Sequence, residues 1–284
     1  MTLDLVIAVV VMLGLAALVG SMTYALTRRR HAGVAIAVAV ALLSLALAQL
    51  LWGRDAIWAV RWLPARTLVV YGEWTPLLVA GVIGAGWRLL PGRPARRCVL
   101  IVPLAGLTLW HAYAGLFERP AGERHLVDRW QRGICRQSTQ TTCGPAAAAT
   151  LLARHAIRAT EPEMAGLCLT TRDGTSLRGL CRGLAIKATG MPLRVTPVVG
   201  GIDDLAAQAP AILSVHLADA EGHDPRFHRE WGWAPGVRHV VVLLGRRADG
   251  RFEIGDPAMG PEAWDRRALE ALWHGEGVRL VREQ

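Results

Sequence analysis

One cysteine of the chain is placed where a protein can use a thiol as a nucleophile. Cys143 opens a segment in which Gly and Pro are followed by an Ala-rich run, a composition that strongly favours a helix. Thr141 or Thr142 can cap this helix, and Pro145 suits its first turn. At a helix N-terminus, unpaired amide groups and the positive end of the macrodipole favour a thiolate over a thiol. Cys143 is therefore a candidate nucleophile for acyl transfer.

A neutral side chain six residues earlier could stabilise the oxyanion that such an attack creates. Gln137 begins the stretch Gln-Ser-Thr-Gln-Thr-Thr that leads to Cys143, and its amide group can donate a hydrogen bond. If this loop turns back over the helix start, Gln137 and the backbone N–H of Cys143 face the same carbonyl oxygen. Two donors arranged in this way are typical of an oxyanion hole.

A nucleophilic cysteine also needs a base and a group that orients the base. The segment from His239 to Asp256 predicts a β-hairpin with its turn centred on Arg247–Ala248, so these two residues are symmetric about the turn. Opposed residues of an antiparallel pair have Cβ atoms about 4.5 to 5.5 Å apart, within reach of an imidazole–carboxylate bond. Pro257 ends the second strand. We expect His239 to act as the base and Asp256 to orient it.

Each of these residues also has an ordinary structural interpretation. A cysteine in an Ala-rich helix is usually a small core residue. A histidine at the start of a strand is usually a polar end, and an aspartate before proline usually forms a turn. The shared chain order, the helix start and the hairpin symmetry together favour the catalytic interpretation.

The elements that must position these residues predict an α+β domain. Helices come first and strands later, an order typical of that class. The expected helices cover Cys143–Ile157, Thr160–Leu167 and Thr175–Thr189, and the expected strands cover Leu193–Val199, Ala211–Leu217, His239–Leu244 and Arg251–Ile254.

The combined pattern resembles a known family. Gln-x5-Cys-Gly, a strand-initial His, a Gly turn and Asp-Pro resemble the papain-like cysteine peptidase domain that removes double-glycine leader peptides in bacteriocin-exporting ABC transporters. The resemblance covers roughly Cys135–Val281, judged by element order. It implies a papain-like fold with Cys143 as nucleophile, His239 as general base and acid, Asp256 as the orienting carboxylate and Gln137 as oxyanion donor. It also implies a peptide or protein substrate.

Three features depart from the exporter pattern. In the exporters the peptidase is cytosolic and precedes the membrane domain, whereas here it follows a series of apolar runs. Lys187 is the only lysine, so the sequence has no phosphate-binding loop ending in Gly-Lys-Ser/Thr, and no ATPase is expected within it. Thr142 precedes the nucleophile, where exporter peptidases usually have Asp. We therefore expect a stand-alone, membrane-anchored peptidase, with a membrane transporter as a partner it could serve.

The first 117 residues predict a membrane domain. A helix needs about 20 apolar residues to cross the roughly 30 Å hydrocarbon layer. Four runs qualify, and the third is interrupted by Glu73, so its crossing is left open. The expected organisation is a membrane domain over 1–117 with helices at 5–27, 32–53, 67–90 and 98–117, a linker over 118–132 and a peptidase domain over 133–284.

The distribution of arginine predicts how these helices are oriented. Seven of the ten Arg residues before position 118 lie after the first run or at the end of the third run and beyond it. Short cytoplasmic loops carry the excess of basic residues. With four crossings, the peptidase domain is then expected on the extracytoplasmic side of a bacterial inner membrane; with three, it is cytoplasmic. Because the basic residues flank apolar runs, the net charge of +9 does not predict a nucleic-acid partner.

Several other residues leave alternatives open. Glu73 and His111 inside apolar runs could serve ion transport, but span ends and packing explain them better. The stretch Ala56–Leu63 is either a short interfacial helix or a loop. The segment His223–Trp233 is expected to form a lid or substrate subsite. No Cys/His spacing predicts a metal site, and no cofactor is expected.

Cysteine chemistry and the reaction type also remain open. One disulfide among Cys135, Cys168 and Cys181 is permitted outside the cytoplasm, and buried free thiols are an equal alternative. A transpeptidase or amidase on the same fold, and a non-catalytic peptide-binding membrane module, are the rival functions.

Overall fold

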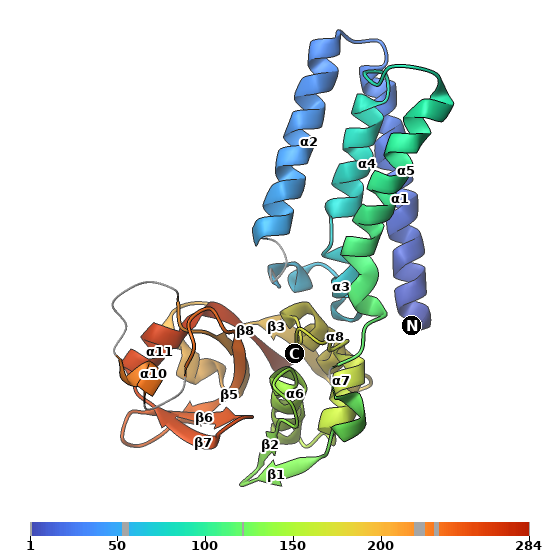
Figure 1. The fold of residues 1–284 in the computed structure, drawn as a ribbon. Coiled ribbons are helices and arrows are strands. Elements are labelled where there is room, and N and C mark those ends of the chain that lie inside the picture. The colour runs from blue at the N-terminus through green and yellow to red at the C-terminus, as the bar shows by residue number, and fades with distance from the viewer. Residues whose placement is uncertain (1, 53–56, 121, 219–224, 230–232, 284) are drawn as a thin grey trace. The chain divides into compact units, whose positions relative to one another are not determined.

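The computed structural model describes residues 2–52, 57–120, 122–218, 225–229 and 233–283. The chain forms two compact units, each described by itself (Figure 1). The first comprises Met1–Ala59 and Thr67–Phe117, and the second comprises Val60–Arg66 and Glu118–Gln284.

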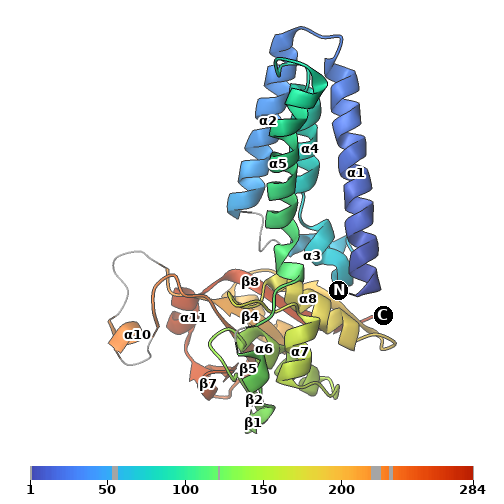
Figure 2. The same cartoon turned by 45° about the vertical axis from the view of Figure 1, so that its right-hand side comes forward.

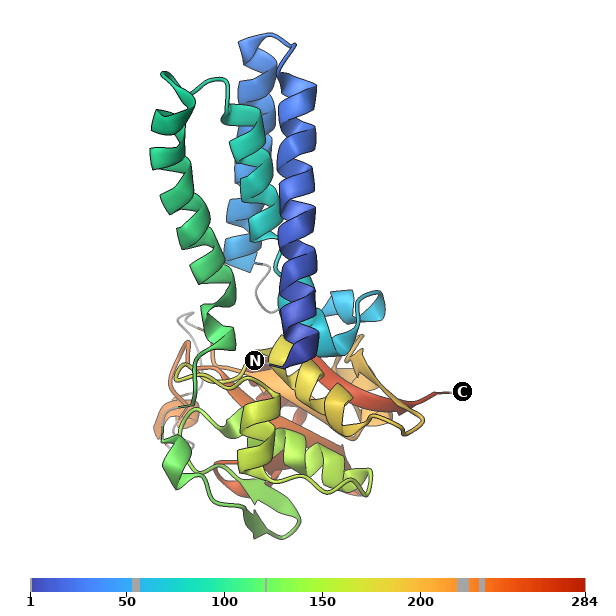
Figure 3. The same cartoon turned by 90° about the vertical axis from the view of Figure 1, so that its right-hand side faces the viewer.

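The first unit is a bundle of apolar helices (Figure 3). Its α-helices are α1 (Leu3–Thr27), α2 (Ala32–Trp52), α3 (Leu68–Tyr71), α4 (Thr75–Gly86) and α5 (Pro94–Tyr113). Short 3₁₀ helices cover Trp58–Arg61, Ala65–Thr67 and Ala114–Leu116. Within the described ranges, the stretches long and apolar enough to cross a membrane are Leu3–Thr27, Ala32–Leu51, Ala65–Gly86 and Pro94–Leu116.

The third of these stretches contains two α-helices, which differs from the single helix expected over 67–90. Gly72 is a weak helix former and Pro76 lacks an N–H, so α3 ends and a new helix starts at Thr75. The Gly72 carbonyl oxygen at this break accepts a hydrogen bond from the Gln49 side chain of α2 at 3.0 Å. Glu73, also at the break, accepts a hydrogen bond from the Thr75 hydroxyl at 2.5 Å.

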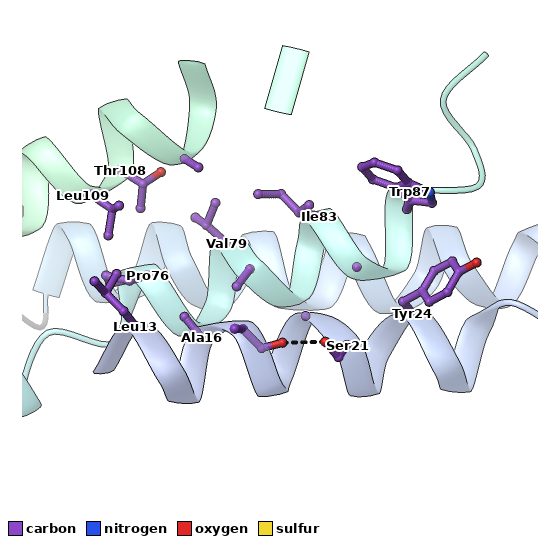
Figure 4. A pocket seen from close by; sticks show the side chains of 15 residues that line it. Leu13, Ala16, Ser21, Tyr24, Pro76, Val79, Ile83, Trp87, Thr108 and Leu109 are labelled. Atoms are coloured by element: carbon purple, nitrogen blue, oxygen red, sulfur yellow. Dashed lines mark hydrogen bonds between the residues drawn. The ribbon is translucent and has the colours of Figure 1, made fainter. Parts of the chain in front are cut away.

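Small residues bring α1 and α4 into close contact. A Cβ atom added at Gly84 would lie 2.1 Å from the Gly20 carbonyl oxygen and 2.3 Å from the Thr23 hydroxyl oxygen. Such contacts allow helix backbones to approach closely in lipid. Beside this contact, an apolar cavity of about 630 Å³ lies among α1, α4 and α5, with Val79 and Ile83 of α4 along it (Figure 4).

Replacing Gly84 by alanine is expected to force α1 and α4 apart. Overpacking of this kind costs about 1–3 kcal/mol, so the thermal unfolding midpoint of the chain in detergent should fall. Gly86→Ala is the matched control in the same helix, because a Cβ there meets nothing within 4 Å. Equal midpoints for the two variants would show that the close contact does not stabilise the bundle.

The second unit begins with a short hairpin and a group of helices (Figure 2). A 3₁₀ helix covers Glu123–His125, and the hairpin and helices are β1 (Arg129–Gln131), β2 (Ile134–Arg136), α6 (Cys143–Arg154), α7 (Glu161–Leu167) and α8 (Leu177–Lys187). Thr160 and Ser176 cap α7 and α8, accepting backbone N–H groups at 3.2 and 3.0 Å. β1 lies within the expected linker, so folded structure begins earlier than 133. α6 ends before the predicted Ile157, because Ala156 adopts a left-handed conformation with φ 58°.

A six-stranded antiparallel sheet follows these helices, which confirms the predicted α+β order. Its strands run in the order β3-β8-β4-β5-β6-β7. They are β3 (Leu193–Pro197), β4 (Ala211–Val215), β5 (His239–Arg246), β6 (Phe252–Asp256), β7 (Gly260–Trp264) and β8 (Trp273–Arg282), and the short helices between them are α9 (Ile202–Leu205), Ala206–Gln208, α10 (Arg226–Arg229) and α11 (Arg266–Leu272). The pattern did not predict β7, α11 or β8, although β8 lies inside the sheet.

α6 packs against the centre of this sheet. Its residues from Cys143 to Leu152 are buried, and they contact β5 and β4. Every residue of β4 is buried as well. The helix that carries Cys143 is therefore fixed beside the strand that begins with His239.

One segment from between the membrane helices packs as part of the second unit. The Arg182 side chain of α8, which is 2% exposed, donates to the backbone carbonyl of Arg66. Arg66 in turn donates to the hydroxyl of Thr189. Within the stretch Ala56–Leu63, expected as a short interfacial helix or a loop, Trp58–Arg61 forms a 3₁₀ helix, and Ala56 lies outside the described residues.

Candidate active site

The hairpin that carries His239 and Asp256 forms with a different register from that predicted. Val242 pairs with Gly255, and a bulge follows toward the turn, which spans Arg247–Arg251. The expected direct opposition of His239 and Asp256 is therefore wrong, because the pairing is displaced by two residues. A displacement by two keeps both side chains on the same face of the sheet. They become diagonal neighbours, still within reach of a long side chain.

His239 and Asp256 contact each other across this diagonal. His239 Nε2 lies 3.0 Å from Asp256 Oδ1, and the side chains are only 17% and 3% exposed. The same oxygen accepts the backbone N–H groups of Ala258 at 2.6 Å and Met259 at 3.1 Å. The turn after β6 thus holds the Asp256 carboxylate in place beside the His239 ring.

His239 and Asp256 each stabilise the charged form of the other. Burial alone would raise the pKa of Asp256, but hydrogen bonds from His239, Ala258 and Met259 outweigh burial and lower it. Burial would likewise lower the pKa of His239. Hydrogen bonds and charges from Asp256 and Cys143 outweigh that effect and raise the pKa of His239 to about 10. The arrangement favours the imidazolium form of His239.

Cys143 lies at the first position of α6, as predicted, and it contacts the His239 ring. Since Nε2 faces Asp256, Nδ1 is the ring nitrogen left for the sulfur. Cys143 is 8% exposed. A Cβ at the next residue, Gly144, would lie 2.7 Å from the Thr175 Cβ, so glycine lets the helix start pack closely there. The thiol is held at the helix N-terminus beside a base.

Gln137 lies in the wall of the same cavity as His239 and Asp256. Its backbone N–H donates to the Pro257 carbonyl oxygen at 3.0 Å, which ties it to the residue after Asp256. Its Nε2 donates to the Thr139 carbonyl oxygen at 3.0 Å. A side-chain amide has two N–H groups, so this bond uses one of them. The four residues predicted for the site therefore come from three segments that meet at one place.

The cavity beside these residues has a volume of about 780 Å³. Trp233 contacts the His239 and Trp264 rings edge to face, each at 5.9 Å between centroids. Trp233 and Phe227, which also lines the cavity, belong to the segment expected to form a lid. His223, Glu230 and Trp231 of that segment lie outside the described residues. Sequence reasoning missed Trp264 because β7 carries no regular alternation of apolar residues.

The remaining cysteines do not resemble nucleophiles. All five are free thiols, and Cys135, Cys168 and Cys181 are buried. Burial raises the pKa of Cys135 and of Cys181 to about 12, and it also raises that of Cys168. Within the described ranges, no group of three His, Cys, Asp or Glu residues could hold a metal ion.

The ionisation of His239 predicts a pH-dependent contribution to stability. Its pKa rises from 6.5 to about 10 in the folded chain. The stabilisation is therefore fully present below about pH 6.5 and is lost as the pH rises through about 10. We expect the unfolding midpoint of the parent chain, measured in detergent, to exceed that of His239→Gln by a margin that shrinks across this window. A constant margin would contradict the ion pair.

Comparisons with known proteins match part of the chain. A family model described as the Peptidase C39 family matches residues 131–222, which include Gln137 and Cys143 but end before His239. An uncharacterised protein of Methanothermobacter marburgensis is 41% identical over 151 residues, which are 53% of this chain and 89% of that protein.

Solved structures similar to the chain include two peptidases of transporters. One is a double glycine motif protease from an AMS/PCAT transporter in complex with the leader peptide, with 17% identity and a TM-score of 0.41, covering 52% of this chain and 90% of that one. Another is the peptidase domain of Streptococcus ComA, a bi-functional ABC transporter, with 17% identity and a TM-score of 0.39, covering 52% of this chain and 96% of that one.

Proposed function

Because this chain belongs to the Peptidase C39 family, we propose that it is a membrane-anchored cysteine peptidase that hydrolyses a peptide bond. The observation that carries the proposal is the position of one imidazole. His239 bonds Asp256 through one ring nitrogen and meets the Cys143 sulfur with the other. This arrangement of nucleophile, base and orienting carboxylate is the one that covalent acyl transfer requires.

The proposed reaction starts with attack of the Cys143 thiolate on the substrate carbonyl carbon. The oxyanion accepts hydrogen bonds from the Gln137 amide and from the Cys143 backbone N–H, which the helix start leaves outside the helical ladder. The imidazolium of His239 then protonates the leaving amine, and the C–N bond breaks. A thioester remains on Cys143. Water, deprotonated by His239, attacks the thioester and releases the acid.

The substrate proposed is a peptide, in particular a leader or a secreted peptide. The resemblance of Gln137–Pro145 to leader-removing peptidases motivates the choice of Gly-Gly as the sequence before the cleaved bond. The cavity of about 780 Å³, with its aromatic side chains, is the proposed peptide-binding site. A membrane transporter is the proposed partner, and the four apolar helices are the proposed membrane anchor.

The test uses the full chain in detergent with a peptide ending in Gly-Gly linked to aminomethylcoumarin. We expect release of the coumarin and a transient acyl adduct on Cys143, detected by mass spectrometry. Added hydroxylamine or an amino acid ester separates hydrolysis from transfer, because a transpeptidase joins the amine to the acyl group. If neither this peptide nor a mixture of proteome-derived peptides is cleaved or forms an adduct, the peptide-binding module becomes the better explanation.

The side of the membrane is a separate proposal. The arginine distribution favours an extracytoplasmic peptidase domain. Alkaline phosphatase fused to the C-terminus should then be active in a bacterial host. An inactive phosphatase fusion together with a fluorescent green-fluorescent-protein fusion would place the domain in the cytoplasm.

A further inference from the structure

A carboxylate without solvent exposure lies behind the loop that carries Gln137. Glu161, the first residue of α7, is 0% exposed. A buried carboxylate is strongly unfavourable unless hydrogen bonds compensate for the lost water. Both of its oxygens bond a single residue: Oε1 accepts the Ser138 backbone N–H at 2.7 Å, and Oε2 accepts the Ser138 hydroxyl at 2.5 Å. Ser138 therefore supplies a hydrogen bond to each oxygen of this buried side chain.

The carboxylate is not required to cap its own helix. Thr160 already caps α7 by accepting the Glu163 backbone N–H at 3.2 Å. Glu161 thus reaches away from α7, across 23 positions of the chain, to the loop before Cys143. An ionised carboxylate only accepts hydrogen bonds, and bonds to a charged acceptor are stronger than neutral ones. Its two bonds, together with the Val127 backbone N–H that donates to the Ser138 hydroxyl at 2.9 Å, define one orientation of Ser138.

Ser138 follows Gln137 directly, so fixing one residue fixes the other. The Gln137 N–H is bonded to Pro257, and the N–H of the next residue is bonded to Glu161. The backbone of Gln137 is therefore held from both sides, by the end of β6 and by α7. The remaining contact, from Gln137 Nε2 to the Thr139 carbonyl oxygen, orients the side-chain amide.

From these contacts we propose that Glu161 is a positioning residue, which holds Gln137 through Ser138 in the place where its amide stabilises the oxyanion. This inference rests on the proposed peptidase function. Glu161 touches neither the substrate nor Cys143. Its effect should therefore appear in the rate of turnover and should depend on the presence of Gln137.

The test is a double-mutant cycle with the full chain in detergent and the Gly-Gly–aminomethylcoumarin peptide. Loss of an oxyanion donor lowers kcat by about 10²- to 10³-fold, so we expect this from Gln137→Ala. Glu161→Gln keeps an acceptor for the Ser138 N–H but loses the charge, and we expect a loss in kcat of about 10-fold with KM within about twofold. In the Gln137→Ala background, Glu161→Gln should change kcat by less than about threefold.

Glu163→Gln is the matched control. Glu163 lies on the same helix and pairs with Lys187 at 2.8 Å, with 42% of its side chain exposed. It should leave kcat unchanged. A second readout is the rate of Cys143 alkylation by iodoacetamide, which forms no oxyanion and should be the same in Glu161→Gln as in the parent chain.

Additive losses in kcat from Glu161→Gln and Gln137→Ala would overturn the inference, as would a change confined to KM. If Glu161→Gln does not fold, as judged by its unfolding midpoint, Ser138→Ala replaces it in the same cycle, with the same expected dependence on Gln137. A Cys143→Ala chain as active as its parent would instead overturn the proposed function. If Cys143→Ala is inactive and the losses in kcat from Glu161→Gln and Gln137→Ala are additive, only the role of Glu161 is overturned.

Discussion

Replacing Cys143 by alanine is expected to reduce kcat for the Gly-Gly–aminomethylcoumarin peptide by at least about 10⁴-fold. Alanine removes the sulfur that forms the acyl bond, and no other described cysteine is placed beside a base. The measurement is coumarin release by the full chain in detergent, with the unfolding midpoint checking that the variant folds. Any residual rate should come from binding and the oxyanion donors alone.

The matched control for this variant is Cys98→Ala, because Cys98 is the exposed cysteine outside the peptidase unit. We expect this control to cleave at the parent rate. Mass spectrometry after iodoacetamide treatment should find the Cys143 adduct in the control and in the parent chain. A Cys143→Ala chain that retains more than about 10% of the parent rate would exclude nucleophilic catalysis by this residue.

Asp256→Asn is expected to lower kcat by about 10²- to 10³-fold. The amide oxygen of the new side chain can still accept the backbone N–H groups that Asp256 Oδ1 accepts, so the geometry is kept while the negative charge is lost. Without that charge, the imidazolium of His239 loses the carboxylate that stabilises it.

The pH profile separates this effect from a loss of structure. Removing the charge lowers the pKa of His239 from its raised value of about 10. The alkaline limb of kcat should therefore move to lower pH in Asp256→Asn. Asp203→Asn is the control, since Asp203 of α9 pairs with Arg266 at the surface and its side chain is 78% exposed. A lower kcat with an unmoved alkaline limb would contradict electrostatic support of His239 by Asp256.

Local chemistry explains what could be predicted from the sequence. An Ala-rich run with a proline in its first turn favours a helix without reference to the rest of the chain, so the sequence predicts the start of α6 at Cys143. The expected cap is wrong, because the Thr142 side chain makes no capping hydrogen bond and bonds Thr139 instead. The resemblance based on Gln137–Pro145 is confirmed by the family match.

Features that depend on distant contacts were missed or misplaced. The bulge in β5 and the longer turn displaced the register of the hairpin, although His239 and Asp256 still meet. β8 contains Gly275 and Gly277 near its start and gave no strand signal, yet pairing with β3 and β4 places it inside the sheet. Glu161 was not singled out, because its only distinguishing property is burial against a loop 23 positions away.

The packing of Val60–Arg66 means that the polypeptide enters the peptidase unit twice. A fragment beginning at Glu118 would lack Val60–Arg66. It would therefore lack the Arg66 carbonyl oxygen, which accepts a hydrogen bond from the buried guanidinium of Arg182. An excised enzyme would therefore expose part of its interior to water. The connection between α2 and α3 thus contributes to the packing of the second unit, and a version without the apolar helices would need Val60–Arg66 grafted back.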